Sequence, residues 1–246
     1  MVSGFDRYYQ IARCFRDEDL RADRQPEFTQ VDLEMSFVNR EHVMQLVERL
    51  FRHLFKELFD KDLQIPFPRL SYEEAMLRYG TDTPDLRFGL EIEDVTDLFT
   101  ATEFSVFRNA IQSGGCVRSI NLKGASEQLS KTDLDGMTPF VKPFKGKGVA
   151  WIRMTEDGPR SPIIKFFSEE ESRSLYARMN AEAGDVLIFA ADAETVVQDC
   201  LAALRDHFGQ KLDLYDSEEM RLGWILEFPL FEKDEKGRPS PMHHPF

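Results

Sequence analysis

The sequence has little of three things that would narrow its class at once: cysteine, net positive charge and long apolar runs. Only three cysteines occur among 246 residues, at positions 14, 116 and 200, and none stands at a short metal-ligand spacing from another. Such sparse, odd-numbered cysteine is typical of a reduced compartment, so we expect a cytoplasmic protein. No apolar run approaches the length of a membrane span, and Met1 is not followed by a signal-peptide pattern, so we expect no membrane partner.

The charge balance is acidic, with a formal net charge of −13. This excludes a generally basic coat for nucleic acid, but it leaves room for a local basic patch, because individual Lys and Arg side chains make phosphate contacts. What the chain does have is hydrophobic material: 42% of its residues are hydrophobic and 21 are Phe. That is enough to build a core for one large domain or two modest ones.

Charge is concentrated in one segment, residues 14–30. It holds three arginines and five carboxylates between two apolar, strand-like runs. Residues 8–15 and 29–37 predict strands, the second because apolar and polar side chains alternate with period two. Together they predict an antiparallel hairpin with a long loop, and long ordered loops in compact domains are usually functional. Gln30 and Asp32 stand two apart, so they share one face of the second strand.

The rest of the chain mixes helices and strands, which predicts an α+β protein. One domain is interrupted by another, since a strand pattern returns near the end of the chain at residues 222–228. The predicted helices cover residues 39–58, 71–79, 94–98, 130–140, 168–181 and 193–208, and the other predicted strands cover residues 103–107, 116–122, 149–154 and 185–191. Residues 234–241 predict a turn-rich loop. Both ends of the chain are abrupt, and we expect a fragment of a longer protein.

The string FRDEDLRADRQPEFTQ (residues 15–30) is similar to motif 2 of class II aminoacyl-tRNA synthetases. With GFDRYYQIARC before it and VDLEMSF after it, it resembles bacterial-type aspartyl-tRNA synthetase. YGTDTPDLR (residues 79–87) and MHHPF (residues 242–246) resemble two further segments of that family in the correct order. The chain departs from the family at Thr83, where the family often has Lys, and it carries no motif 1, motif 3 or anticodon-binding barrel.

The resemblance implies a partial class II catalytic core with an antiparallel sheet, interrupted by an α+β GAD insertion domain. The expected boundaries are 1–99 for the core with its motif 2 hairpin, 100–213 for the insertion, and 214–246 for the return to a truncated core. It implies that the parent protein is a homodimer.

The resemblance also implies roles for single residues. Arg16 would bind the ATP α-phosphate and the carboxylate of aspartate, because a planar guanidinium can hold both and neutralise developing charge. Asp17, Glu18 and Gln25 would lie along ATP, and Phe28 would stack on adenine. Without the resemblance, Arg16 is a strand-end arginine paired with a neighbouring carboxylate, and Phe28 is a residue of the hairpin core.

Gln30, Asp32 and His243 would contact the substrate aspartate, Asp32 by pairing with its ammonium group. A hydrogen-bonded sheet carboxylate is the plainer interpretation of Asp32. Arg21 and Arg24 would contact the tRNA acceptor stem, or else form salt bridges inside the loop that contribute little. Mg²⁺ would be held by ATP phosphates and carboxylates, and no metal-ligating histidine is expected.

The function implied is ATP-dependent activation of L-aspartate to aspartyl-adenylate, followed by transfer to the 3′ end of tRNA(Asp). The alternative is a catalytically incomplete fragment that acts only as a structural or tRNA-contacting insertion module. A relative that activates aspartate or asparagine without charging tRNA is a third possibility. Whether tRNA(Asn) is also a substrate stays open. A basic cluster at Lys142, Lys145, Lys147 and Arg153 predicts either a tRNA contact or a solvated face.

Overall fold

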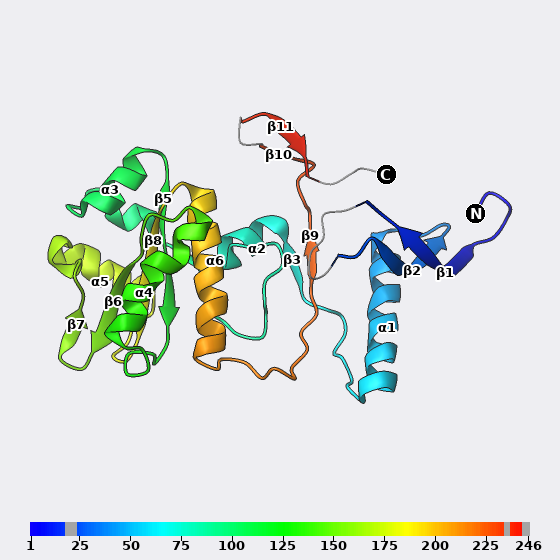
Figure 1. Ribbon diagram of the computed structural model, residues 1–246, viewed down its shortest axis with the longest axis horizontal. Helices are drawn as coiled ribbons and strands as arrows, with labels where there is room; N and C mark the ends of the chain where they lie inside the picture. Colours follow the sequence, from blue (N-terminus) through cyan, green and yellow to red (C-terminus); the bar gives the residue numbers. More distant parts are fainter. Residues whose placement is uncertain (18–23, 234–236, 243–246) are drawn as a thin grey trace. The chain divides into compact units, whose positions relative to one another are not determined.

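The computed structural model describes residues 1–17, 24–233 and 237–242, and it divides the chain into two compact units, residues 1–67 and 68–246. The predicted domain boundaries near residues 99 and 213 both fall inside the second unit and stay predictions. Each unit is described by itself below, and Figure 1 shows the elements of both.

The first unit begins with the predicted hairpin. Strands β1 (Arg7–Phe15) and β2 (Glu27–Met35) pair antiparallel, and the register runs from Arg7 opposite Met35 to Phe15 opposite Glu27. Side chains on β2 alternate between exposed and half-buried from Glu27 to Asp32, as period two requires. The alternation therefore fixes which side chains share a face.

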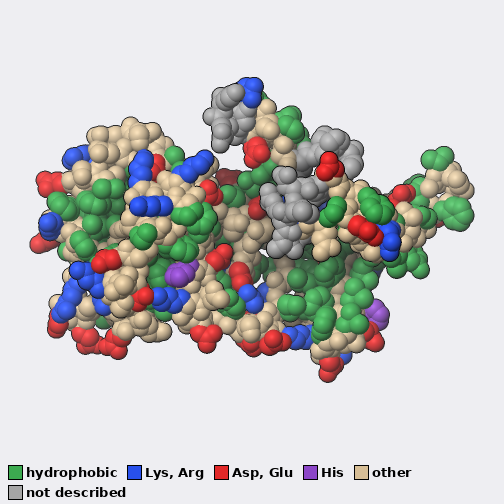
Figure 2. Space-filling view, viewed as in Figure 1, with side chains coloured by type: hydrophobic (Ala, Val, Ile, Leu, Met, Phe, Trp, Pro, Cys, Tyr) green, Lys and Arg blue, Asp and Glu red, His purple; other side chains and the backbone are tan. Residues whose placement is uncertain are grey.

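Helix α1 (Arg40–Phe59) follows the hairpin and begins where the start predicted at Asn39 places it. The reason is a capping box: the Asn39 side chain accepts the His42 amide, while His42 Nδ1 accepts the Asn39 amide, each at 3.2 Å. The helix ends at Asp60, which adopts a left-handed conformation. Buried Glu48 accepts the Phe67 amide at 3.2 Å and so holds the end of the unit against α1. Figure 2 shows hydrophobic side chains gathered over this helix.

The second unit opens with a short strand and helix that a distant segment joins. Strand β3 (Arg69–Ser71) leads into α2 (Tyr72–Tyr79), whose N-terminus carries the predicted capping box between Ser71 and Glu74. Strand β9 (Trp224–Leu226) pairs parallel with β3, in the register Arg69 opposite Trp224. The returning strand predicted at residues 222–228 thus forms over its central three residues.

Between these paired strands lies a three-layer domain, residues 93–212. Its sheet has five strands in the order β4-β5-β8-β6-β7, and all neighbours are antiparallel. The strands are β4 (Glu93–Asp94), β5 (Cys116–Leu122), β6 (Ala150–Thr155), β7 (Gly158–Arg160) and β8 (Val186–Asp192). The helices are α3 (Ser105–Gln112), α4 (Lys131–Val141), α5 (Glu169–Arg178) and α6 (Glu194–Lys211), with short 3-10 turns η1 (Thr96–Phe99), η2 (Lys142–Phe144) and η3 (Ile164–Phe166). The predicted α+β class with an antiparallel sheet is confirmed, and the identity of this domain as a GAD domain stays a prediction.

Two hydrophobic cores lie on the two faces of the sheet, and strand β8 contributes to both. Val186, Ile188 and Ala190 belong to the core shared with α4 and α6, whereas Leu187 and Phe189 belong to the core shared with α3 and α5. Because neighbouring side chains of a strand point to opposite faces, a fully buried strand must be apolar throughout. This explains why residues 185–191 lack the alternation seen in the hairpin.

One sequence prediction is wrong here. Residues 103–107 were expected to form a strand, but α3 begins at Ser105. The pattern E-F-S-V alternates over four residues, yet the buried residues of the helix are Phe107 and Ala110, three apart, which is helical spacing. The short run was too brief to separate the two periods. The last pair of strands, β10 (Phe231–Lys233) and β11 (Pro239–Pro241), places part of the predicted loop at residues 234–241 in a strand.

Candidate functional site

Arg16 and Phe28 meet at the loop end of the hairpin. The Arg16 amide donates to the Pro26 carbonyl at 2.9 Å, which extends the ladder one step past the last paired residues. The Arg16 side chain is exposed, and its guanidinium carbon lies 5.2 Å from the centroid of the half-buried Phe28 ring. A guanidinium over an aromatic face is a cation–π contact, which contributes modestly at exposed sites. The strand end therefore presents a cation directly beside a flat apolar surface.

Polar side chains continue along the same face of the hairpin. Phe28, Gln30 and Asp32 are half-buried on one face of β2, as period two predicts; Met35, at the other end of the strand, is the fourth half-buried residue. Gln10 stands opposite Asp32 and donates its side-chain amide to the Asp32 carboxylate at 3.1 Å. The arrangement is a row that runs from the guanidinium, past a ring and an amide, to a carboxylate. Such a row can bind a ligand with an anionic group at one end and a cationic group at the other.

Two neighbours of this row were missed from the sequence. Gln10 pairs with Asp32, and the Cys14 thiol lies 3.9 Å from the Gln30 side-chain oxygen. The strand register could have found both, because Gln10 and Cys14 lie opposite Asp32 and Phe28. The opposite face is different in character: there Arg13 and Glu27 form an exposed ion pair at 3.2 Å.

The remaining predicted residues are only partly placed. Asp17, Arg24 and Gln25 are exposed at the ends of the loop. Glu18, Arg21 and His243 lie outside the described residues, so their predicted roles stay predictions.

A hollow in the first unit lies away from the row of Arg16, Phe28, Gln30 and Asp32. A cavity of about 780 Å³ lies among residues such as Arg7, Glu34 and His42, at the open end of the hairpin next to α1. In the ladder register this end is opposite to the end that carries Arg16. The exposed Arg16 side chain and the half-buried Phe28 ring therefore do not line this cavity.

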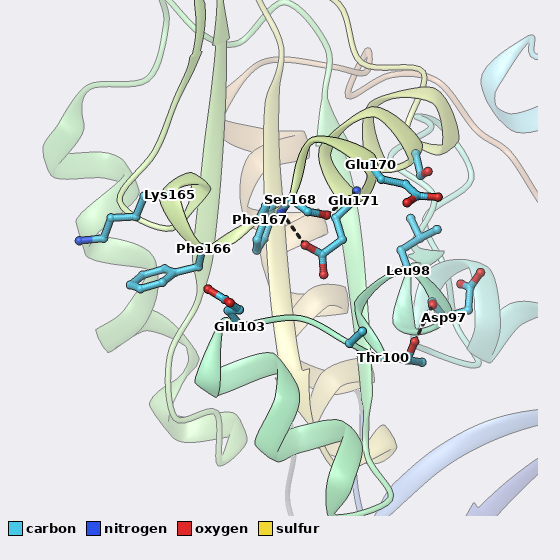
Figure 3. Close-up of a pocket in the computed structure, with 12 residues that line it drawn as sticks. Asp97, Leu98, Thr100, Glu103, Lys165, Phe166, Phe167, Ser168, Glu170 and Glu171 are labelled. Carbon is cyan, nitrogen blue, oxygen red and sulfur yellow. Dashed lines mark hydrogen bonds between the residues drawn. The ribbon is translucent and has the colours of Figure 1, made fainter.

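A hollow in the three-layer domain is acidic and already internally paired. It measures about 750 Å³ and lies between η1, η3 and the start of α5. Figure 3 shows Glu171 turned back onto Ser168, whose amide donates to the Glu171 carboxylate at 2.7 Å. Asp97 holds Arg178 through two hydrogen bonds, and this pairing lowers the pKa of the Asp97 carboxyl. The carboxylates here oppose a phosphate ligand, and none of the predicted site residues lines the hollow.

The basic cluster predicted in this domain is partly engaged in its own fold. Lys147 forms an ion pair with Asp192 at 2.9 Å, and Arg153 donates to the Leu129 carbonyl at 2.6 Å. Figure 2 shows Lys and Arg interspersed with Asp and Glu on the face in view. This favours the solvated-face interpretation over a dedicated tRNA surface.

Two further properties of the described residues concern metal binding and membranes. Within residues 1–17, 24–233 and 237–242, no group of three or more His, Cys, Asp or Glu side chains could hold a metal ion. None of the helices in the described part of the chain has both the length and the apolarity that crossing a membrane requires.

Comparison with known proteins shows to which family the chain belongs. The aspartate–tRNA(Asp/Asn) ligases of Geobacillus sp. (strain WCH70) and Aquifex aeolicus are each 52% identical to it over its whole length. The aspartate–tRNA ligase of Shouchella clausii is 48% identical, again over the whole chain. The chain spans 42% of the Geobacillus protein and 41% of the Aquifex protein, so the relatives are more than twice as long. The profile of the tRNA synthetases class II (D, K and N) matches residues 1–246, and the chain belongs to that family.

Proposed function

We propose that this chain is the central part of an aspartate–tRNA ligase. The carboxylate oxygen of L-aspartate attacks the α-phosphorus of ATP, the bond to the bridging oxygen breaks, and pyrophosphate leaves. The 3′-terminal hydroxyl of tRNA(Asp) then attacks the aspartyl carbonyl, and AMP leaves. The observation that carries the proposal is the row from Arg16 through Phe28 and Gln30 to Asp32, found within a family whose sequence profile covers the whole chain.

The row supplies complementary groups for both substrates. Adenine stacked on the Phe28 ring would leave the phosphates close to Arg16, because the guanidinium lies 5.2 Å from that ring. Asp32 would pair with the ammonium group of aspartate, and Gln10 holds that carboxylate in place. Asp17, Glu18 and Gln25 complete the ATP contacts, while Gln30 and His243 complete those to aspartate. These groups act by positioning and by stabilising charge, without forming covalent bonds.

ATP in this family implies Mg²⁺, which needs a set of oxygen ligands. The described residues contain no set of three possible ligands, so this part of the chain does not by itself form a metal site. The phosphates of ATP would be the main ligands of the ion. The parent protein would be a cytoplasmic homodimer, and the three-layer domain would be its GAD insertion domain.

Aspartate-dependent ATP–pyrophosphate exchange tests the proposal in the complete protein that carries this chain. Arg16→Ala should lower exchange by about 10²–10³-fold, because one donor to the developing charge is lost. Arg13→Ala is the matched control, since Arg13 lies on the same strand but faces the other way and pairs with Glu27. Near-normal exchange in Arg16→Ala would refute the assignment of this row.

The transfer step needs a separate measurement. Arg24→Ala should reduce aspartylation of tRNA(Asp) while leaving pyrophosphate exchange intact, because phosphate contacts position tRNA and do not serve activation. Equal loss in both assays would place Arg24 in the ATP site instead.

The alternative, a module that contributes structure or tRNA contact without catalysis, applies to the chain in isolation. It is favoured by the chain's span of only 42% of its relative. Residues 1–246 alone should therefore show no exchange under conditions where the complete protein is active. Robust exchange by residues 1–246 would show that the chain contains a sufficient active site.

A further inference from the structure

The Asp32 carboxylate is held by a residue of the neighbouring strand. Gln10 of β1 stands directly opposite Asp32 of β2, and its Nε2 donates to Asp32 Oδ2 at 3.1 Å. Among the residues that the structure describes, Gln10 is the one hydrogen-bond donor to this carboxylate. Side chains directly opposite one another in an antiparallel pair are close enough to interact, so the contact follows from the strand register. Both strands therefore build this end of the row.

The Gln10–Asp32 pair has acceptor oxygens to spare. A carboxylate only accepts hydrogen bonds, whereas a side-chain amide has an oxygen that accepts and a nitrogen that donates. The Gln10 amide spends a donor on Asp32 Oδ2, and no described residue donates to Asp32 Oδ1 or to Gln10 Oε1. Gln10 is exposed and Asp32 is only half-buried. The pair is therefore accessible to a ligand that brings donors of its own.

The charge around the pair is negative. Glu34 lies on the same face of β2, two residues beyond Asp32, and its side chain is exposed. The cationic Arg16 is at the other end of the row, beside the Phe28 ring. Two carboxylates at one end and a guanidinium at the other favour a cationic group of the ligand at the Gln10–Asp32 end.

We propose that Gln10 is a specificity-determining residue, which forms with Asp32 the subsite for the α-ammonium group of the amino-acid substrate. This inference rests on the proposed function, in which Asp32 pairs with that group. An ammonium group has three donors and no acceptor, so a carboxylate oxygen and an amide oxygen both match it. Gln10 then has two tasks: its Nε2 fixes the Asp32 carboxylate, and its Oε1 accepts a hydrogen bond from the ammonium group.

Such a subsite selects for the ammonium group and against acids that lack it. A site built to hydrogen-bond one group of a substrate rejects an analogue without that group, because the polar atoms of the site are left unpaired. Succinate is aspartate without the amino group, and it keeps both carboxylates. Its binding does not use the Gln10–Asp32 pair, so a change at Gln10 should weaken the binding of aspartate and leave that of succinate as it is.

Two variants test the proposal in the complete protein that carries this chain. Gln10→Met keeps a long unbranched side chain but removes the donor to Asp32 and the acceptor for the ammonium group. Gln10→Ala removes the same two groups together with the bulk of the side chain. Arg13→Ala is the matched control, because Arg13 is on the same strand, faces the other way and pairs with Glu27.

The measured quantities are the KM for aspartate in ATP–pyrophosphate exchange and the inhibition constant of succinate as a competitor of aspartate. Gln10→Met should raise the KM for aspartate by about tenfold, because hydrogen bonds to charged groups are lost. The kcat, the KM for ATP and the inhibition constant of succinate should each stay within about twofold of the wild-type value, as expected when only binding of the ammonium group is removed. Gln10→Ala should behave in the same way, and Arg13→Ala should change none of these constants.

Equal rises in the KM for aspartate and in the inhibition constant of succinate would overturn the proposal, since they would indicate a general disturbance of the hairpin. Wild-type protein for which succinate competes as well as aspartate binds would also overturn it. Should succinate compete too weakly to measure, the KM for ATP serves as the reference constant in its place. Should Gln10→Met fail to fold, Gln10→Ala decides by the same criteria.

Failure of the subsite and failure of the proposed function give different results. Wild-type protein without aspartate-dependent exchange would overturn both. Active wild-type protein whose KM for aspartate is unchanged in Gln10→Met and Gln10→Ala would overturn the subsite alone.

Discussion

Two arginines of this chain use the same side chain in opposite ways. Arg16 ends a strand of an exposed hairpin and rests beside one aromatic ring. Arg205, on α6, is fully buried: it donates to the carbonyls of residues 85, 88 and 89 and lies against the rings of Tyr79 and Phe88. A guanidinium that must bind a ligand has to be accessible to it, as the exposed Arg16 side chain is. A guanidinium that supports structure gives most of its donors to the protein itself. Burial and partners, more than residue type, separate the two roles.

The two arginines should differ most in how much each contributes to the free energy of unfolding. Arg205→Met should lower the free energy of unfolding of the three-layer domain by about 2–4 kcal/mol, since buried carbonyls lose their donor and two cation–π contacts disappear. Urea unfolding followed by Trp151 fluorescence in a Trp224→Phe background would measure it, because the chain has two tryptophans. Ordinary surface substitutions change stability by no more than about 0.5 kcal/mol. A loss below that value would mean that the carbonyls and rings do not enclose Arg205 in solution.

The buried part of α6 also predicts that the free energy of unfolding depends on pH. Burial raises the pKa of the Cys200 thiol on α6 from 9.0 to about 11. The folded state therefore holds this proton more tightly than the unfolded state, so the stabilisation is complete below pH 9 and is lost as the pH rises towards 11. The loss should be about 2–3 kcal/mol at 1.36 kcal/mol for each pKa unit.

The measurement is urea unfolding at a series of alkaline pH values. Cys200→Ala should flatten the decline over this window, because the residue that releases the proton is gone. If both proteins lost stability in parallel, another group would be responsible.

On the exposed side, Phe28→Leu should raise the KM for ATP by about tenfold, since base–aromatic stacking contributes about 1–3 kcal/mol. Steady-state pyrophosphate exchange in the complete protein measures it. Phe15→Leu is the control, because Phe15 lies on the opposite face of the hairpin at the same end. An equal rise in both variants would indicate a general loss of hairpin packing.

The smallest expected effect is that of Arg16→Met on stability. An exposed arginine at the end of a strand should change the free energy of unfolding by no more than about 0.5 kcal/mol. Thermal unfolding of the chain would measure this. A much larger loss would give Arg16 a structural role and remove the contrast with Arg205.

The sequence was most informative where periodicity was simple. The hairpin, the shared face of Phe28, Gln30 and Asp32, and the capping box at Ser71 could all be predicted, because local rules determine them. The strand expected at residues 103–107 is not observed, because a run of five residues is too short to distinguish period two from a short helix. Pairing with distant carbonyls leaves little local trace, which is why the contacts of Arg205 were not predicted.

One feature of the sequence nevertheless indicated that this face of α6 makes a contact. An amphipathic helix normally carries solvated side chains opposite its apolar face. In α6 the second stripe instead holds Gln198, Ala202, Arg205 and Gly209, with two small residues flanking one arginine. Small residues at helical spacing permit close approach of another backbone, so the stripe indicated a second contact.

The parallel pairing of β3 with β9 has a consequence for the order of folding. Trp224 stands beside Arg69 across 155 residues of chain, as the register shows. Closing so long a loop in an unfolded chain costs about 4–5 kcal/mol of entropy, far more than a three-residue ladder returns. Once the three-layer domain has folded, it acts as a rigid spacer that brings its own entry and exit segments together. The pairing of β3 with β9 should therefore form last, after the three-layer domain has folded.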